Sequence, residues 1–276
     1  MRYKGTPSYK FLIGRRVLPP VSCVFAWAVF FLFCGGGLLA GEDGDAPIAE
    51  SYIDESDVRS QVVDETGDIY KYLLEGNAKN YDALWRLSRF HVLRGIAAGN
   101  KKAKKREWSL AREYAESAID VRPDGAEGHL YLATSLAKMG QYLPASRKVK
   151  NAGLIKTELE TAIEFDPALH KAYMVLGVWH REVATASSVE RQLAGMFFGS
   201  LPDASLEQSL SLIKRSIDLG GNAVRNHCEL ARTYEALGDH EGARAEYSKV
   251  LSMVPDSPGD RTLKEEAEQY LREENI

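Results

Sequence analysis

The sequence predicts an all-α fold, namely a right-handed α-solenoid of four degenerate helical hairpins with insertions and a C-terminal capping helix. Three observations predict this class. From about Val62 onward, apolar residues recur at helical spacing, and proline is nearly absent inside the periodic segments. No run of alternating β-branched residues indicates a strand. One pattern of small residues returns four times along the 276-residue chain.

Residues 1–41 are predicted to be a signal peptide or a membrane anchor. A basic stretch without acidic residues precedes the apolar run Val21–Phe33, and small residues then lead to Gly41, which is the layout of a secretory signal. The alternative is an uncleaved anchor, because Val21–Ala40 is just long enough to span a bilayer. In both cases the positive flank stays inside. We therefore expect the body to be exported, either periplasmic or anchored at the outer face of the inner membrane.

Residues 42–61 are polar and aperiodic, which predicts a linker before a helical-repeat domain at 62–276. The first 40 residues hold five of the 35 basic residues and no acidic ones, so 30 basic residues face 39 acidic ones in the remainder. This acidic body argues against nucleic-acid binding. Of the three cysteines, only Cys228 lies outside the N-terminal segment, so the body cannot contain an intramolecular disulfide.

The clearest hairpin is predicted at Val224–Pro255. Two helices of about a dozen residues are joined at Gly238, and small residues, Ala231 and Ala243, stand where the helices would cross. This arrangement is typical of a tetratricopeptide repeat (TPR). Arg261–Glu274 is polar on one face and would cap the end of the solenoid.

Three further hairpins follow the same pattern with longer spacing. In chain order, the small residue of the first helix is Ser88, Ala133, Gly177 and Ala231, and its counterpart in the second helix is Ala118, Ala162, Ser216 and Val250. A Pro or Gly closes each hairpin five residues later, at Pro123, Pro167, Gly221 and Pro255. Only the last pair has the standard TPR separation. The first three hairpins are thus expected to carry about 11, 10 and 20 extra residues between their helices.

Two segments carry a narrower resemblance. Ala168–Ala184 contains a Leu-Gly-Val-Trp sequence, and Met196–Pro202 contains Phe-Phe-Gly before the next helix. Both resemble the regulator-of-microtubule-dynamics family over roughly residues 62–255, and more distantly the T-components of periplasmic TRAP transporters. The resemblance implies a TPR-like fold. The signal-like N-terminus and acidic body fit an exported bacterial member better than a cytosolic microtubule binder.

We predict no catalytic, cofactor or metal site, and therefore no enzyme. No phosphate-binding loop, dinucleotide-binding turn or zinc-protease motif occurs. Among the six histidines, His129 and His227 occupy equivalent repeat positions, as do His91 and His180, which favours packing over metal binding.

Two other features allow two interpretations each. The basic block Lys101–Arg106 is either a solvated extension of a second helix or a contact for an anionic partner. The apolar residues Met196, Phe197 and Phe198 in the longest insertion either bury themselves as a lid or form a ligand-pocket wall or subunit contact, which leaves a homo-oligomer open.

The first helices of such hairpins line a concave groove, which we predict to be the binding site for a protein or peptide partner. Arginine forks there would also suit a small carboxylated or apolar ligand, as in a TRAP-type accessory. A membrane-anchored microtubule binder is the alternative for a eukaryotic source. The membrane is expected to be contacted only through the N-terminal segment. The predicted groove residues are Trp85, Arg89, Tyr131, Thr134, Met174, Arg181 and Arg232.

Overall fold

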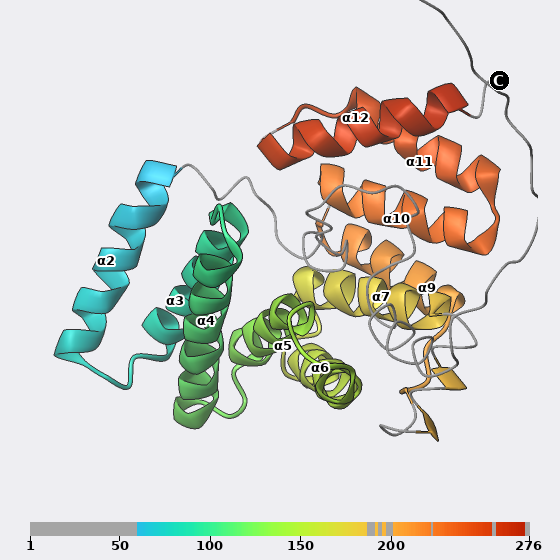
Figure 1. Ribbon diagram of the computed structural model, residues 1–276. Helices are drawn as coiled ribbons and strands as arrows, with labels where there is room; N and C mark the ends of the chain where they lie inside the picture. Colours follow the sequence, from blue (N-terminus) through green and yellow to red (C-terminus); the bar gives the residue numbers. More distant parts are fainter. Residues whose placement is uncertain are drawn as a thin grey trace, which may run out of the picture.

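The computed structural model describes residues 60–186, 191–192, 195–196, 201–221, 223–255 and 258–273. Within these ranges all regular structure is helical (Figure 1). None of the described helices is both long and apolar enough to cross a bilayer. The predicted N-terminal signal or anchor and nearly all of the predicted linker lie outside the described residues, so both stay predictions.

The four predicted hairpins are confirmed, and each pairs two consecutive helices (Figure 1). One further helix, α2 (Ser60–Gly76), precedes them and packs on the first. In chain order the hairpins are α3 (Tyr81–Ala97) with α4 (Lys101–Val121), α5 (Ala126–Gly140) with α6 (Ala145–Phe165), α7 (His170–Thr185) with α9 (Leu206–Asp218), and α10 (Val224–Leu237) with α11 (His240–Ser252).

Small residues lie at the helix crossings, as the repeat pattern requires. Ser88 and Ala118 are fully buried in the first hairpin, and the Ser88 hydroxyl donates to the Ala111 carbonyl at 2.7 Å. In the third hairpin, a Cβ placed on Gly177 would come within 2.6 Å of Ile213 Cγ1. The close approach of the helices therefore excludes larger side chains at these positions.

The insertions of the first two hairpins form extra helical turns rather than loops. Ala118 lies 17 residues after the first residue of α4, and Ala162 lies 17 residues after the first residue of α6. The equivalent Val250 lies only 10 residues after the first residue of α11. Two helical turns at the start of α4 and two at the start of α6 thus have no counterpart in the fourth hairpin. We call these turns the α4–α6 overhang.

The third insertion behaves differently, because α9 has no such extension. Ser216 lies 10 residues after the first residue of α9, as in the fourth hairpin. The extra residues therefore fall in the connection from Ala186 to Ser205, much of which lies outside the described residues.

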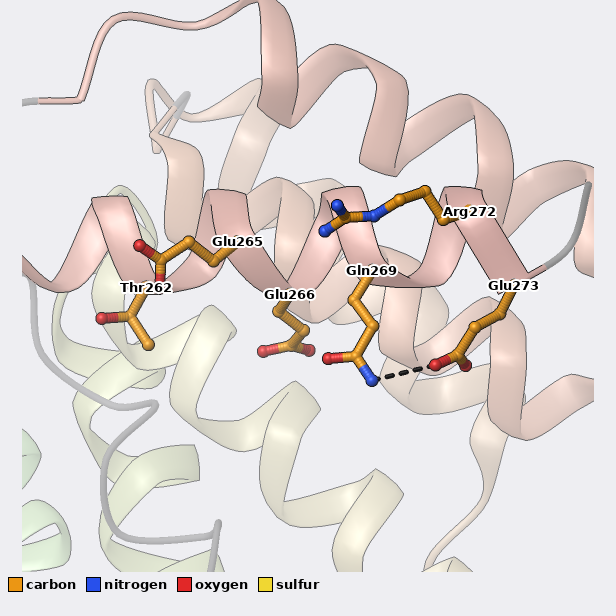
Figure 2. A pocket seen from close by; sticks show the side chains of 6 residues that line it. All are labelled: Thr262, Glu265, Glu266, Gln269, Arg272 and Glu273. Carbon is orange, nitrogen blue, oxygen red and sulfur yellow. Dashed lines mark hydrogen bonds between the residues drawn. The ribbon is translucent and has the colours of Figure 1, made fainter.

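The capping helix is confirmed as α12 (Pro258–Glu273), which packs on α11 and α10. Leu263 and Ala267 on its inner face are buried. Its outer face carries polar side chains (Figure 2). By its contacts, α12 takes the place that the first helix of a fifth hairpin would have.

The apolar core falls into two clusters of buried residues. The larger cluster runs through α3 to α7, and a smaller one joins α10, α11 and α12 around Cys228, Tyr247 and Val250. α5 is buried over almost its whole length and on every side, so it forms the centre of the larger cluster. The junction between the two clusters lies where α7 and α9 meet α10.

Candidate partner-binding surface

The structure brings together two of the predicted groove residues in the N-terminal half. The Trp85 and Tyr131 rings stack with centroids 5.8 Å apart and planes within 6°. Both rings are buried, and the Arg86 guanidinium lies 4.3 Å from the Trp85 ring centroid. Arg89 is half-buried on the same helix. These side chains are packing residues in this structure, and a contact with a partner stays a prediction for them.

Two further groove residues are also buried. Thr134 turns its hydroxyl back to donate to the Leu130 carbonyl at 2.8 Å, and Met174 belongs to the larger core cluster. The pattern of first-helix positions thus located residues that face neighbouring helices. It did not reveal how completely they are covered.

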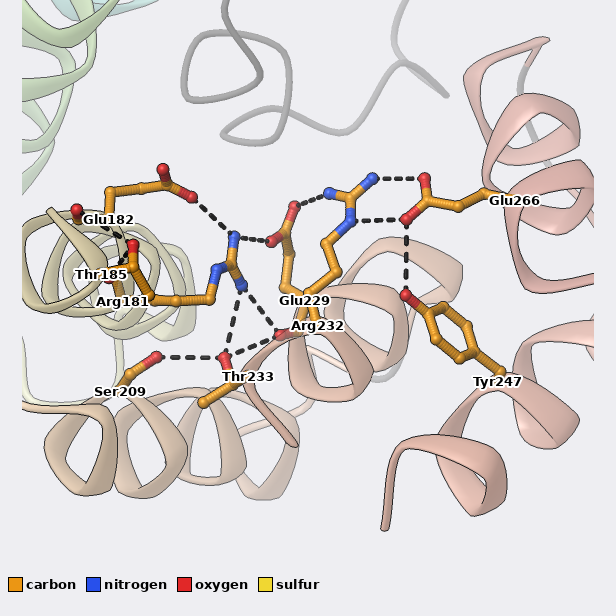
Figure 3. A network of polar contacts seen from close by, with 9 residues as sticks. All are labelled: Arg181, Glu182, Thr185, Ser209, Glu229, Arg232, Thr233, Tyr247 and Glu266. Carbon is orange, nitrogen blue, oxygen red and sulfur yellow. Dashed lines mark hydrogen bonds and ion pairs between the residues drawn. The ribbon is translucent and has the colours of Figure 1, made fainter. Parts of the chain in front are cut away.

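Arg181 and Arg232 come together through a carboxylate between them (Figure 3). The Arg181 Nη2 donates to Glu229 Oε2 at 2.6 Å, and the Arg232 Nη1 donates to Glu229 Oε1 at 2.7 Å. Glu229 is 0 % exposed and is therefore held entirely by these two guanidiniums and the surrounding helices.

The row continues in both directions, so that charges alternate along it. On one side Arg181 Nη2 contacts Glu182 at 3.2 Å, and on the other Arg232 makes a two-pronged contact with Glu266 of α12 at 2.8 and 2.5 Å. We call this row the charge ladder; its members are Glu182, Arg181, Glu229, Arg232 and Glu266. It crosses α7, α10 and α12, three successive first-helix positions (Figure 3).

The environment of the charge ladder shifts the pKa values of Glu229 and Glu182 in opposite directions. Burial alone would raise the pKa of Glu229, but the positive charges of Arg232 and Arg181 outweigh it and hold this pKa below its ordinary value. Burial dominates at Glu182, whose pKa is raised. The Tyr247 hydroxyl, which donates to Glu235 and lies near Glu266, also has a raised pKa, mainly because of burial.

Sequence reasoning missed Glu229 and Glu266 as partners of the two arginines. One signal was available, because Glu229 lies three residues before Arg232 and shares its helix face. The contact of Arg181 with Glu229, 48 residues along the chain, left no comparable signal. Whether either arginine also meets a partner stays a prediction.

Beyond Glu266, an open pocket of about 490 Å³ lies on the outer face of α12 (Figure 2). Three carboxylates and one guanidinium line it, and Gln269 donates to Glu273 at 2.9 Å. An exposed surface with this charge suits lysine, arginine or amide groups of a polypeptide. The lining residues are Thr262, Glu265, Glu266, Gln269, Arg272 and Glu273.

The predicted pocket wall in the long insertion is only partly described. Met196 is 67 % exposed, whereas Phe197 and Phe198 lie outside the described residues. The two interpretations of this segment, a self-burying lid and a wall or subunit contact, both stay predictions.

The described part of the chain holds no group of three or more metal-ligating side chains placed around a common point. Three histidines of first helices instead pair with glutamates of second helices: His91 with Glu107 at 2.8 Å, His129 with Glu158 at 2.6 Å, and His227 with Glu246 at 2.6 Å. Burial raises the pKa of the Cys228 thiol, which disfavours a thiolate nucleophile.

Stacked hairpins with small residues at the crossings, closed by a capping helix, define a TPR-type helical-repeat protein. The chain belongs to the family described as regulator of microtubule dynamics protein 1-3, whose model matches residues 52–275. The predicted family resemblance is thereby confirmed, whereas the more distant one to TRAP T-components stays a prediction.

Individual relatives agree with this assignment. Regulator of microtubule dynamics protein 1 of Bos taurus is 26 % identical over 211 residues, which cover 75 % of this chain and 67 % of the relative. The Homo sapiens protein is 27 % identical over 191 residues, 68 % and 60 % of the two chains. Among solved structures, a thermophilic TPR protein of Thermus thermophilus matches with a TM-score of 0.55 at 17 % identity, over 76 % of this chain and 90 % of that one. This last likeness concerns the fold alone.

Proposed function

We propose that this protein is a non-catalytic scaffold that binds a protein or peptide partner along its first helices, with the α12 pocket as the accessible end of the site and the largely buried charge ladder as its support. The observation that carries the proposal is the continuity of this surface. The charge ladder joins three successive first-helix positions and leads directly into the exposed pocket at Glu266. A surface that spans several repeats is the feature by which solenoids bind extended partners.

The ladder has a supporting part in this proposal. The buried pair of Arg181 and Glu229 holds α7 against α10, and the contact of Arg232 with Glu266 holds α10 against α12. The exposed pocket residues, in contrast, can exchange water for groups of a partner at little cost to the fold. Partner binding is therefore expected to depend on α12 more directly than on the two arginines.

Affinity capture with the full chain, followed by titration of the purified captured protein, tests this assignment. Glu265→Lys places a positive charge in the pocket and should weaken binding about tenfold or more. Glu268→Lys is the matched control, since it makes the same charge change at an exposed α12 position outside the pocket lining. Equal affinities for the two variants would exclude the α12 pocket from the binding site.

The names of the relatives suggest a more specific candidate, in which the partner belongs to the microtubule system. Support for it is the family membership over residues 52–275. Co-sedimentation with microtubules assembled from purified tubulin tests it directly. If the protein stays in the supernatant at all tubulin concentrations, microtubules are excluded as its partner, and the scaffold role is unaffected.

Export or anchoring through residues 1–41 is a separate proposal that rests on the sequence alone. A fusion of residues 1–45 to a reporter that is active only outside the cytoplasm should give signal in the native host. An expressed but silent fusion would contradict export. Binding of a small carboxylated or apolar ligand, as in a TRAP-type accessory, stays a prediction that mass spectrometry of the captured material can address.

A further inference from the structure

The α4–α6 overhang is strongly basic on a chain whose body is acidic. The first six residues of α4 include five cationic side chains, and the first six of α6 include three. Lys101, Lys102, Lys105, Arg147 and Lys150 are exposed. None of these five forms an ion pair with another described residue.

One aromatic side chain links the two basic helix ends. The Tyr142 ring stacks on Trp108 of α4 with centroids 5.9 Å apart, and Tyr142 lies two residues before the N-cap of α6, Pro144. The ammonium groups of Lys101 and Lys105 lie 5.2 and 5.1 Å from the centre of the Tyr142 ring. The connection that leads into α6 therefore lies against the cations of α4.

The cations at the starts of α4 and α6 occupy positions where they lower the stability of these helices. The N-terminal end of a helix carries a partial positive charge and favours acidic side chains, yet the first turns of α4 and α6 contain none. Like charges at positions i and i+4, such as Lys101 with Lys105, add repulsion. The first turns of α2, α7 and α10 also lack acidic side chains, so the distinctive feature of α4 and α6 is the cluster of cations at their starts. Such clusters on two helices are the pattern expected where a surface is kept for binding.

The location agrees with such a role. The basic residues occupy the extra turns that the first two hairpins have and the fourth lacks, so the fold of a hairpin does not need them. The buried carboxylate of α4, Glu107, is already engaged by His91 and Arg106. The positive charge of Lys101, Lys102 and Lys105 thus remains available to a ligand from solution.

We propose that the overhang is a second binding surface, separate from the proposed site at α12, that takes an acidic, extended polypeptide segment. A narrow ligand fits better than a membrane for two reasons. Apart from Ser146, the exposed side chains of the overhang are cationic, and they lack the large apolar groups with which interfacial helices enter lipid. A planar anionic surface would also face the acidic remainder of the chain, whereas a single segment contacts only the basic part.

Fluorescence anisotropy of the full chain with a labelled oligoglutamate peptide tests the proposal, with oligoglutamine of the same length as the uncharged control. We expect binding to oligoglutamate alone, and weaker binding as the salt concentration rises. Replacing Lys101, Lys102 and Lys105 with Gln should weaken it about tenfold, because each exposed ion pair contributes little by itself. Replacing Arg147 and Lys150 with Gln should give a smaller loss in the same direction.

The matched control replaces three exposed cations elsewhere, Lys214, Arg215 and Arg244, with Gln. It makes the same change in net charge and should keep the affinity. An equal loss in this control would overturn the proposal, since net charge would then explain the binding. Stronger binding to vesicles with phosphatidylserine than to oligoglutamate would overturn it in favour of lipid. Both results are independent of the α12 site, which Glu265→Lys tests separately.

Discussion

Single atoms at the hairpin crossings decide which side chains this fold tolerates. At Gly177, an added Cβ would lie 2.6 Å from Ile213 Cγ1 and 3.1 Å from the Ser209 carbonyl oxygen. Ile213 is fully buried and the carbonyl belongs to the backbone, so neither can move freely.

Gly177→Ala should therefore lower the free energy of unfolding by about 1–3 kcal/mol, and Gly177→Leu by about 2–4 kcal/mol. Urea denaturation measures both. The matched control is Gly140→Ala at the last residue of α5, where an added Cβ meets nothing within 4 Å. A Gly177→Ala protein as stable as this control would show that the helices approach less closely than in the structure.

The histidines carry opposite pH dependences. Burial lowers the pKa of His180 to about 4, and Lys156 adds to this effect. Between pH 6.5 and 4 the unfolded chain thus binds a proton here that the folded chain does not. The contribution of His180 to stability is complete above pH 6.5 and is lost as the pH falls toward 4, so His180→Gln should flatten the acid side of the stability profile.

His129 provides the comparison of opposite sign. The hydrogen bond to Glu158 raises the pKa of His129. The contribution of His129 to the stability of the fold is therefore complete below the ordinary histidine pKa and is lost as the pH rises through the raised value. His129→Gln should hence cost more stability at pH 5 than at pH 8. If the free energy of unfolding of both variants changed with pH just as that of the wild type does, the assigned charge states would be contradicted.

At the element scale, the helices differ in how far their ends follow the usual charge preference. Arg215 stands in the last turn of α9, where a cation is favourable, whereas Lys102 and Arg147 stand in the first turns of α4 and α6. All three side chains are exposed.

Lys102→Glu and Arg147→Glu should each raise the free energy of unfolding by about 0.3–1 kcal/mol. Arg215→Glu, at the opposite end of a helix, should lower it by a similar amount. Thermal melts at low salt record both signs. A loss of stability in Lys102→Glu would mean that the lysine makes a contact that offsets its unfavourable place in the helix.

The elements also show what sequence could and could not predict. The hairpins were predictable because the small residue of each second helix, such as Ala118 or Ala162, is followed five residues later by a Pro or Gly, which is a local pattern. For the first insertion, one of the two interpretations of Lys101–Arg106 was an extension of the second helix, and α4 has this form. The same form of the second insertion, in α6, was not anticipated. The burial of the groove residues depends on contacts between neighbouring repeats whose residues are far apart in sequence, and no local pattern indicates those.

For the whole molecule, the important boundary is the one between the two core clusters. The charge ladder crosses it, with Arg181 on α7 and Glu229 on α10. Since each repeat contacts mainly its neighbours, a break at this boundary need not spread to α3–α6.

Glu229→Gln removes the buried charge that both arginines share, and should destabilise the junction by about 3–5 kcal/mol. Hydrogen exchange should then show α10–α12 losing protection while α3–α6 keep theirs. Glu241→Gln at an exposed position of α11 serves as the control and should change neither region. Uniform loss of protection along the chain would instead indicate one cooperative unit.

The thiol of Cys228 can report on local opening of the smaller core cluster. Its sulfur is 0 % exposed and donates to the Leu263 carbonyl of α12 at 3.6 Å, so a thiol reagent can reach it only while α12 and α10 are apart. The labelling rate of this sulfur therefore measures how often α12 separates from α10. Because Cys23 and Cys34 are about 200 residues away from Cys228 in sequence, mass spectrometry of the labelled peptides separates the three signals. A ligand that holds α12 in place should lower the labelling rate of Cys228.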